Sequence, residues 1–174
     1  MTTCTGPLVS DRLTAPTDSA GLRKAFAQFP NGLVAVAARV CGSPHGLVVA
    51  SFVPVSLDPP LVSVCIQHTS TTWPQLQRAT SIGISLLGYD QQQVAYGLGG
   101  KGDRFAGVEL HDGQGDSLFI GGAAAWLETQ VYAQYPAGDH SMVLLQVERV
   151  STSDNGDPLV FHGSACRRLR TDPG

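Results

Sequence analysis

Short apolar segments separated by glycine- and proline-rich turns most constrain how this chain can fold. Seven segments are rich in Val, Ile, Leu and Ala, at residues 33–40, 46–53, 61–67, 81–87, 123–135, 141–150 and 159–166. Many short strands at close spacing are typical of a closed antiparallel barrel or a sandwich. The connections are too short for repeated βαβ units, so a parallel sheet is not expected.

Helical patterns are few and short. Asp18 or Ser19 can cap a helix that runs to Phe29, before the turn at 30–32. Two further helices are predicted, over 70–79 with Pro74 in the first turn and over 91–98. Residues 1–18 are rich in Thr, Pro and Asp and are predicted to form a flexible N-terminal arm. We therefore expect one mainly β domain over residues 19–170.

The low charge content indicates that part of the surface is covered. Charged residues make up 14% of the chain, against about 25% in typical domains. A second copy of the chain is the simplest cover, so we expect a homodimer. The net charge is -3, and the basic cluster Arg167, Arg168 and Arg170 is too small to predict nucleic-acid binding. Neither a signal peptide nor a long apolar segment occurs, so no membrane span is expected and the cytoplasm is the expected location.

Several kinds of chemistry lack their sequence motifs. The chain contains no Walker A loop, no GxGxxG, no HExxH and no GxSxG. The cysteines and histidines show no ligand spacing, so no metal site is predicted. The cysteines are expected to be reduced thiols, although a disulfide between Cys41 and Cys166 stays open.

Hydroxyl side chains at strand ends and at a helix start offer donors to an anion: Ser51, Ser56, Ser70, Thr71 and Thr72. Free N–H groups at a helix start bind phosphate well, but such residues more often only cap the helix. His140 follows Gly138 and Asp139 at the start of an apolar strand, where a lone histidine is more often structural than functional.

Five motifs occur in a fixed order along the chain. They are the segment 46–62, which holds Gly46-Leu-Val-Val-Ala-Ser51-Phe and Ser56-Leu-Asp-Pro-Pro-Leu-Val62, then Ser70-Thr-Thr-Trp73, Asp103-Arg-Phe-Ala-Gly107, Gly122-Ala-Ala-Ala-Trp-Leu-Glu128 and Gly138-Asp-His140. Together they resemble the short-chain flavin reductase family over about residues 22–168. The segment 135–140 is similar to reductases that partner aromatic-polyketide monooxygenases in actinomycete antibiotic pathways.

This resemblance implies a homodimeric FMN-binding split β-barrel with the flavin near the dimer interface. The residues implied along the isoalloxazine and ribityl groups are Val48, Val49, Ala50, Ser51, Phe52, Val55 and Ser56. Ser70, Thr71 and Thr72 would hold the phosphate, next to Trp73. Lys101 and Phe105 would close over the flavin. His140 is the implied catalytic residue, in contact with the nicotinamide or close to it.

The implied activity is that of an NAD(P)H:flavin oxidoreductase. Hydride would pass from C4 of NADH or NADPH to N5 of FMN or FAD, and the reduced flavin would supply a partner monooxygenase. Such a reaction depends on positioning and needs no acid–base pair. A non-enzymatic flavin-binding module is a further alternative.

Several residues depart from the family pattern. Val48 replaces the usual Thr, Ala50 the usual Ser or Asn, Thr71 a frequent Arg, and Ser85 a frequent Asn. The apolar replacements leave a second hypothesis open. In that hypothesis a repurposed split-barrel tailoring enzyme acts on a polycyclic natural product with little or no reductase activity.

Overall fold

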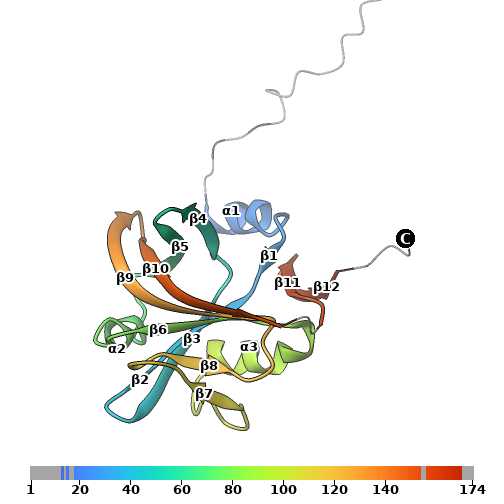
Figure 1. The fold of residues 1–174 in the computed structure, drawn as a ribbon. Helices are drawn as coiled ribbons and strands as arrows, with labels where there is room; N and C mark the ends of the chain where they lie inside the picture. The colour runs from blue at the N-terminus through green and yellow to red at the C-terminus, as the bar shows by residue number, and fades with distance from the viewer. Residues whose placement is uncertain (1–12, 14, 16–17, 154–155, 170–174) are drawn as a thin grey trace, which may run out of the picture.

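The computed structural model describes residues 13, 15, 18–153 and 156–169. The arm predicted at 1–18 therefore lies almost entirely outside the described residues. Seven strands form the main sheet: β2 (Val34–Val40), β3 (Ser43–Val49), β4 (Val53–Leu57), β5 (Pro60–Gln67), β6 (Ile82–Leu86), β9 (Ala125–Ala137) and β10 (His140–Thr152). Their order is β3-β2-β6-β9-β10-β5-β4, and every pair is antiparallel (Figure 1). The predicted mainly β fold is thus confirmed.

The sheet curls into a barrel that stays split along one side. Residues of β3 and β5 approach each other, but these two strands share no ladder in the described part of the chain. The Ser51 hydroxyl bridges the split instead, because it accepts from the Cys65 N–H at 2.8 Å and donates to the Cys65 carbonyl at 3.2 Å. The split therefore leaves room between β3 and β5 while one side chain fixes its width.

β2 is buried on both faces. Val34, Val36 and Ala38 face the barrel interior, where they pack with apolar residues of β5, β6 and β10. Leu33 and Ala35 belong to a second cluster with Ala95 and Leu98 of α3 (Gln92–Gly99). A strand that is covered on both faces has apolar residues at successive positions. This explains why polar and apolar residues do not alternate over 33–40.

Three predicted elements end earlier or divide. The first helix is α1 (Ser19–Phe26), capped by Asp18, and it ends before Phe29 because Pro30 disfavours helical geometry in the residue before it. The helix predicted over 70–79 is reduced to α2 (Trp73–Leu76), since the N–H of Trp73 bonds to the Ser70 hydroxyl at 3.2 Å and only turns follow.

The strand predicted at 159–166 is a hairpin of β11 (Leu159–His162) and β12 (Ala165–Arg168). Gly163 and Ser164 form its turn with φ of 58° and 61°, the left-handed values that a two-residue hairpin turn requires.

Four short strands and one helical turn were not predicted. β4 lies between the strands predicted at 46–53 and 61–67, and β1 (Asn31–Gly32) pairs with β11. β7 (Leu110–Asp112) and β8 (Leu118–Ile120) form a separate hairpin, and a 3₁₀ turn, η2 (Tyr89–Gln91), precedes α3. Cys41, Cys65 and Cys166 are free thiols, so the disulfide left open above is not formed. None of the described helices is long and apolar enough to cross a membrane.

Candidate active site

A large cavity lies in the split of the barrel. Its volume is about 520 Å³, and its walls come from both strands that border the split and from the segments beside them: Asn31, Leu47, Val48, Val49, Ala50, Ser51, Cys65, Ile66, Gln67, Ser70 and His140. We call it the split cavity. One wall is a row of small apolar residues, whereas hydroxyl, amide and imidazole groups border the rest. Such a slot suits a planar ring that carries polar substituents.

A second cavity of about 480 Å³ lies beyond β3. It is lined by Pro44, His45, Gly46, Thr71, Thr72, Gln75, Gly102, Asp103, Arg104 and Phe105. We call it the loop cavity, because residues 102–105 form one wall. Gly46 is required there, since a Cβ atom at this position would lie 2.7 Å from Cζ of Phe105. The bare backbone at Gly46 lets the Phe105 ring pack directly on β3.

Arg104 ties the walls of the loop cavity together. Its Nη1 donates to the Thr72 hydroxyl at 2.6 Å and to the Gly46 carbonyl at 3.2 Å, and its Nε donates to the Gly100 carbonyl at 3.2 Å. No carboxylate of a described residue pairs with this guanidinium. The loop cavity therefore holds a guanidinium without an ion pair beside two threonine hydroxyls, groups that can bind an anion, and the Asp103 carboxylate lines the same cavity.

His140 stands at the rim of the split cavity. It begins β10 and pairs with Gln67 of β5, which brings it to the split. Its Nδ1 lies 2.6 Å from Oδ1 of Asp139, so the other ring nitrogen remains for a ligand. The hydrogen bond and charge of His140 lower the pKa of Asp139 below its ordinary value, and this keeps the carboxylate ionised beside the imidazole.

The structure divides the predicted site residues into three groups. Val48, Val49, Ala50, Ser51, Ser70 and His140 line the split cavity, and Thr71, Thr72 and Phe105 line the loop cavity. Five others line neither cavity: Phe52, Val55, Ser56, Trp73 and Lys101.

The five residues outside the cavities have other surroundings. Phe52 and Trp73 pack in the barrel core, and Trp73 Nε1 is buried without a partner among the described residues. Val55 and Lys101 are exposed, and the Ser56 hydroxyl accepts from the N–H of Asp58. These side chains can act on a ligand only indirectly, unless a partner chain brings a ligand to them.

Sequence reasoning missed several residues of the two cavities. Arg104 belongs to the segment 101–105 that the resemblance placed over the flavin, but its bonds to Thr72 and Gly46 were not predicted. Asn31, Cys65 and Gln67 carried no signal, because each belongs to a turn or a strand whose pairing decides what it faces.

Three of the four departures from the family pattern fall in the cavities. Val48 and Ala50 line the split cavity and Thr71 lines the loop cavity. Ser85 is different, because its buried hydroxyl accepts from the N–H of Ile120 at 3.0 Å. The serine at position 85 therefore removes no hydrogen-bond donor from either cavity.

The split cavity offers an apolar slot for a planar ring, and the loop cavity beside it offers threonine hydroxyls and a guanidinium for an anionic tail. Residues 26–170 match the family model described as a flavin reductase like domain, and the chain belongs to this family. This match confirms the family that the five motifs indicated.

Relatives cover most of the chain. A protein of Streptomyces coelicolor named actinorhodin polyketide dimerase is 36% identical over 146 residues, which are 83% of this chain and 82% of that protein. The reductase component of 4-hydroxyphenylacetate 3-monooxygenase from Thermus thermophilus is 33% identical over 147 residues, which are 84% of this chain and 94% of that protein. A structure of an NADH:FAD oxidoreductase from Streptomyces globisporus, solved with NAD and FAD fragments, superposes with a TM-score of 0.85 at 31% identity. That match covers 93% of this chain and 99% of the other, and it confirms the predicted split barrel.

Proposed function

We propose that this protein is an NAD(P)H:flavin oxidoreductase that acts in the cytoplasm and supplies reduced flavin to a partner monooxygenase. The observation that carries the proposal is the pairing of the two cavities, an apolar slot and a cavity that holds Arg104 and two threonine hydroxyls. Membership of the flavin reductase family supports it, as do relatives named as reductase components of two-component oxygenases and halogenases.

The residues present fit FMN, or the FMN half of FAD. The split cavity is lined by Val48, Val49 and Ala50, along which the isoalloxazine ring would lie. Ser70 lines the split cavity, and its neighbours Thr71 and Thr72 line the loop cavity. The ribityl chain would therefore pass Ser70, and the phosphate would reach Thr72 and Arg104. When bound, the flavin supplies an electron acceptor for a hydride at N5.

The chain's own contribution is positioning. Val48, Val49 and Ala50 exclude water from one face of the slot, and Arg104 neutralises the anionic tail. His140 is held by Asp139 at the rim, where it can donate to or accept from the amide of a nicotinamide ring. No residue has to transfer a proton for a hydride to move between two stacked rings, so geometry is the main catalytic device.

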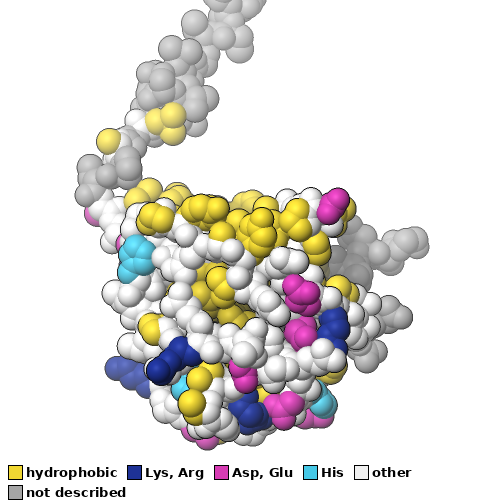
Figure 2. Space-filling model, turned by 60° about the vertical axis from the view of Figure 1, so that its left-hand side comes forward, with side chains coloured by type: hydrophobic (Ala, Val, Ile, Leu, Met, Phe, Trp, Pro, Cys, Tyr) yellow, Lys and Arg dark blue, Asp and Glu magenta, His cyan; other side chains and the backbone are white. Residues whose placement is uncertain are grey.

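A second copy of the chain completes this proposal. Exposed apolar side chains include Val53, Val55 and Leu57 of β4 and Tyr132 and Tyr135 of β9. Figure 2 shows hydrophobic side chains gathered along the edge of the molecule at which α1 and β4 lie. Contiguous apolar surface of this kind is typical of a protein–protein interface. The predicted homodimer would bury it and bring Val55 and Ser56 close to the partner's split cavity.

The variant His140→Ala is expected to raise the KM for NADH while leaving the dissociation constant of FMN within twofold. One lost side-chain hydrogen bond changes affinity by about two- to tenfold. Steady-state kinetics at saturating FMN, together with flavin fluorescence titration, separates the two effects. Equal weakening of FMN and NADH would contradict a role at the nicotinamide.

The variant Val48→Thr is expected to tighten flavin binding by about two- to tenfold, because it restores a hydroxyl at the cavity wall. The matched control is Val150→Thr on β10, an exposed valine that lines neither cavity. Fluorescence titration with FMN measures both. An unchanged affinity in Val48→Thr would mean that the position does not face the flavin.

Loss of NADH absorbance, with and without added FMN, tests the proposed activity. The same assay is repeated with NADPH and with FAD. Flavin-dependent loss well above the protein-free rate supports the reductase. A folded protein without such activity would favour the second candidate, a tailoring enzyme acting on a polycyclic metabolite. The apolar replacements at Val48 and Ala50 and the relative named as a polyketide dimerase favour that candidate.

A further inference from the structure

Asn31 borders the end of the split cavity that lies away from the loop cavity. Gly46 lines the loop cavity and Ala50 lines the split cavity. These two residues are four positions apart, which is about 13 Å in an extended chain. Val34 pairs with Val49 in the antiparallel ladder of β2 and β3, so the chain before Val34 lies beside the residues that follow Val49. Asn31 therefore stands at the Ala50 end of the slot.

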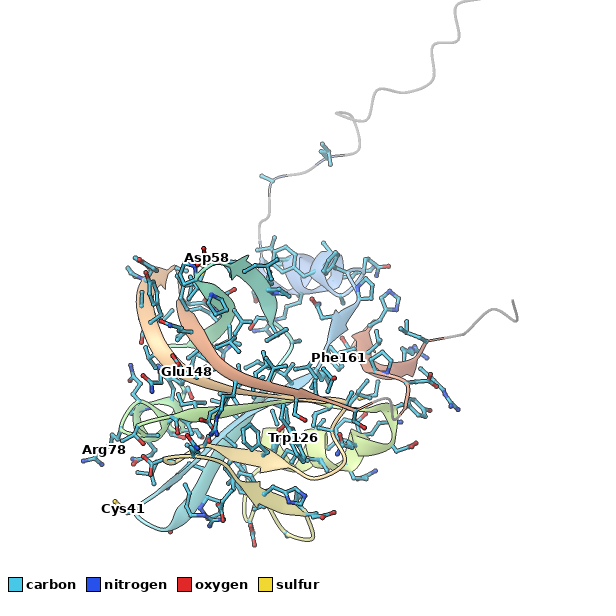
Figure 3. The ribbon with its side chains drawn as sticks, in the orientation of Figure 1. Cys41, Asp58, Arg78, Trp126, Glu148 and Phe161 are labelled. Atoms are coloured by element: carbon cyan, nitrogen blue, oxygen red, sulfur yellow. The ribbon has the colours of Figure 1, made fainter. Side chains whose placement is uncertain are left out.

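The backbone of Asn31 is held in place by a strand from the other end of the chain. Asn31 pairs with Phe161 of β11, which Figure 3 labels. Two residues further on, Leu33 donates its N–H to the Leu159 carbonyl at 3.1 Å, and Leu33 is buried in the cluster that includes α3. A side chain on a paired strand meets a ligand in a defined geometry. The carboxamide of Asn31 is therefore presented to the cavity from a fixed position.

One hydrogen bond orients this carboxamide. Nδ2 of Asn31 donates to the Phe29 carbonyl at 3.2 Å. A carboxamide carries two N–H donors and one oxygen acceptor. The second N–H and Oδ1 of Asn31 have no partner among the described residues. A donor and an acceptor thus stand side by side at this end of the slot.

The rest of the slot leaves few polar groups for a ligand. The Ser51 hydroxyl both accepts from and donates to the backbone of Cys65. The Ser70 hydroxyl accepts from the N–H of Trp73 at the end of the slot near the loop cavity. The residues that line the split cavity include no Asp, Glu, Lys or Arg. The Ala50 end therefore suits a neutral group that has a donor next to an acceptor.

We propose that Asn31 recognises the imide edge of the flavin, with Oδ1 accepting from N3–H and Nδ2 donating to the O4 carbonyl. This inference rests on the proposed function. With the phosphate at Thr72 and Arg104, the ring edge opposite the ribityl group reaches the far end of the slot. That edge carries O4, with N3–H beside it. A carboxamide pairs with an adjacent donor and acceptor, as Asn does with the edge of a base. Asn31 thus selects a flavin whose N3 carries a hydrogen.

The probe for this contact is 3-methyl-FMN, which keeps the phosphate, the ribityl chain and O4 but has a methyl group in place of the N3 hydrogen. We expect the wild type to bind FMN about tenfold or more tightly than 3-methyl-FMN, because the methyl group leaves Oδ1 unpaired. Asn31→Ala should weaken FMN binding about two- to tenfold and bring the ratio of the two dissociation constants close to one. Titration of flavin fluorescence without NADH measures both constants.

Two further variants separate recognition from structure. Asn31→Asp and Asn31→Ala both lose the bond to the Phe29 carbonyl, but Asp keeps an acceptor at the position of Oδ1. Asn31→Asp should therefore still prefer FMN over 3-methyl-FMN, whereas Asn31→Ala should not. Gln93→Ala removes an exposed carboxamide of α3 that lines neither cavity. It should leave both dissociation constants within twofold of the wild-type values.

The outcomes differ for the inference and for the proposed function. Equal affinity of the wild type for FMN and 3-methyl-FMN, or a ratio unchanged in Asn31→Ala, would overturn the inference. A preference lost equally in Asn31→Ala and Asn31→Asp would also overturn it, because the bond to Phe29 would then explain the effect. FMN that binds with the expected pattern but is not reduced by NADH or NADPH would refute the proposed function and support the inference. A folded protein that binds no flavin would refute both.

Discussion

Replacing Glu128 by alanine lowers the free energy of unfolding by about 3 kcal/mol, the lower end of what removal of one partner costs in a buried ion pair. Glu128 lies on β9 with only 8% of its surface exposed. Its carboxylate accepts from Arg149 of β10 at 2.6 Å, from the N–H of Gln114 at 2.9 Å and from the Ser117 hydroxyl at 3.0 Å. One side chain therefore fastens the β7–β8 connection to the barrel wall. Arg149 is half exposed, so water can solvate it in the variant, which limits the loss.

Urea unfolding of the wild type, Glu128→Ala and Glu148→Ala measures this effect. Glu148 is an exposed residue of the same strand pair, labelled in Figure 3, and it has no ion pair among the described residues. Its removal should change stability by less than about 0.5 kcal/mol. Equal unfolding midpoints for the two variants would show that the Glu128 cluster does not stabilise the fold.

The contribution of Glu128 should also depend on pH. Burial raises the pKa of its carboxyl group, but the hydrogen bonds from Arg149, Gln114 and Ser117 outweigh burial and leave the pKa below the ordinary value of 4.5. A folded-state pKa below the unfolded one stabilises the protein above pH 4.5, and this stabilisation is lost as the pH falls through the folded-state pKa. The stability difference between wild type and Glu128→Ala should therefore shrink in acid.

Replacing Arg104 by alanine is expected to weaken FMN binding by about ten- to a hundredfold. The variant loses hydrogen bonds that connect residues 100–105 with Gly46 and Thr72, together with the guanidinium charge of the loop cavity. A hydrogen bond to a charged group contributes about 1.5–3 kcal/mol, which corresponds to that range of affinity. Titration of flavin fluorescence measures the change.

Riboflavin and Lys101 provide the controls for Arg104. Riboflavin lacks the phosphate, so its affinity should change much less than that of FMN. Lys101 is an exposed cation of the same loop that lines neither cavity, and Lys101→Ala should change FMN affinity less than twofold. An equal loss for riboflavin and FMN in Arg104→Ala would mean that Arg104 acts on the loop alone and does not hold the phosphate.

Local patterns in the sequence predicted much of the barrel. Apolar segments bounded by Gly and Pro were found as strands β2, β5, β6, β9 and β10, because each buries at least one face. β7 and β8 have three residues each, too few to show any periodicity. The hydroxyl-rich start at 70–72 suggested a long helix, but the Ser70 side chain bonds the first helical N–H and the helix stops after one turn.

Only the site residues that stand in recognisable sequence motifs could be predicted. Residues 48–51 and 70–72 were identified because they stand in recognisable motifs, and the fold brings them to adjoining cavities. The bond between Arg104 and Thr72 joins residues 32 positions apart. Asn31 lines the split cavity from β1, which pairs with β11 far along the chain. Such contacts follow from strand pairing over long distances, which residue patterns do not determine.

Anaerobic mixing of the purified protein with NADH and FMN tests the central claim most directly. The absorbance of oxidised flavin is followed until the reaction ends, and NADPH and FAD are then substituted in turn. The account predicts loss of oxidised flavin at one molecule per molecule of donor, at a rate far above that without protein, and a lower rate for Arg104→Ala when FMN is limiting. Flavin that is reduced no faster than in the protein-free mixture by either donor, although the circular dichroism shows a folded β protein, would contradict it.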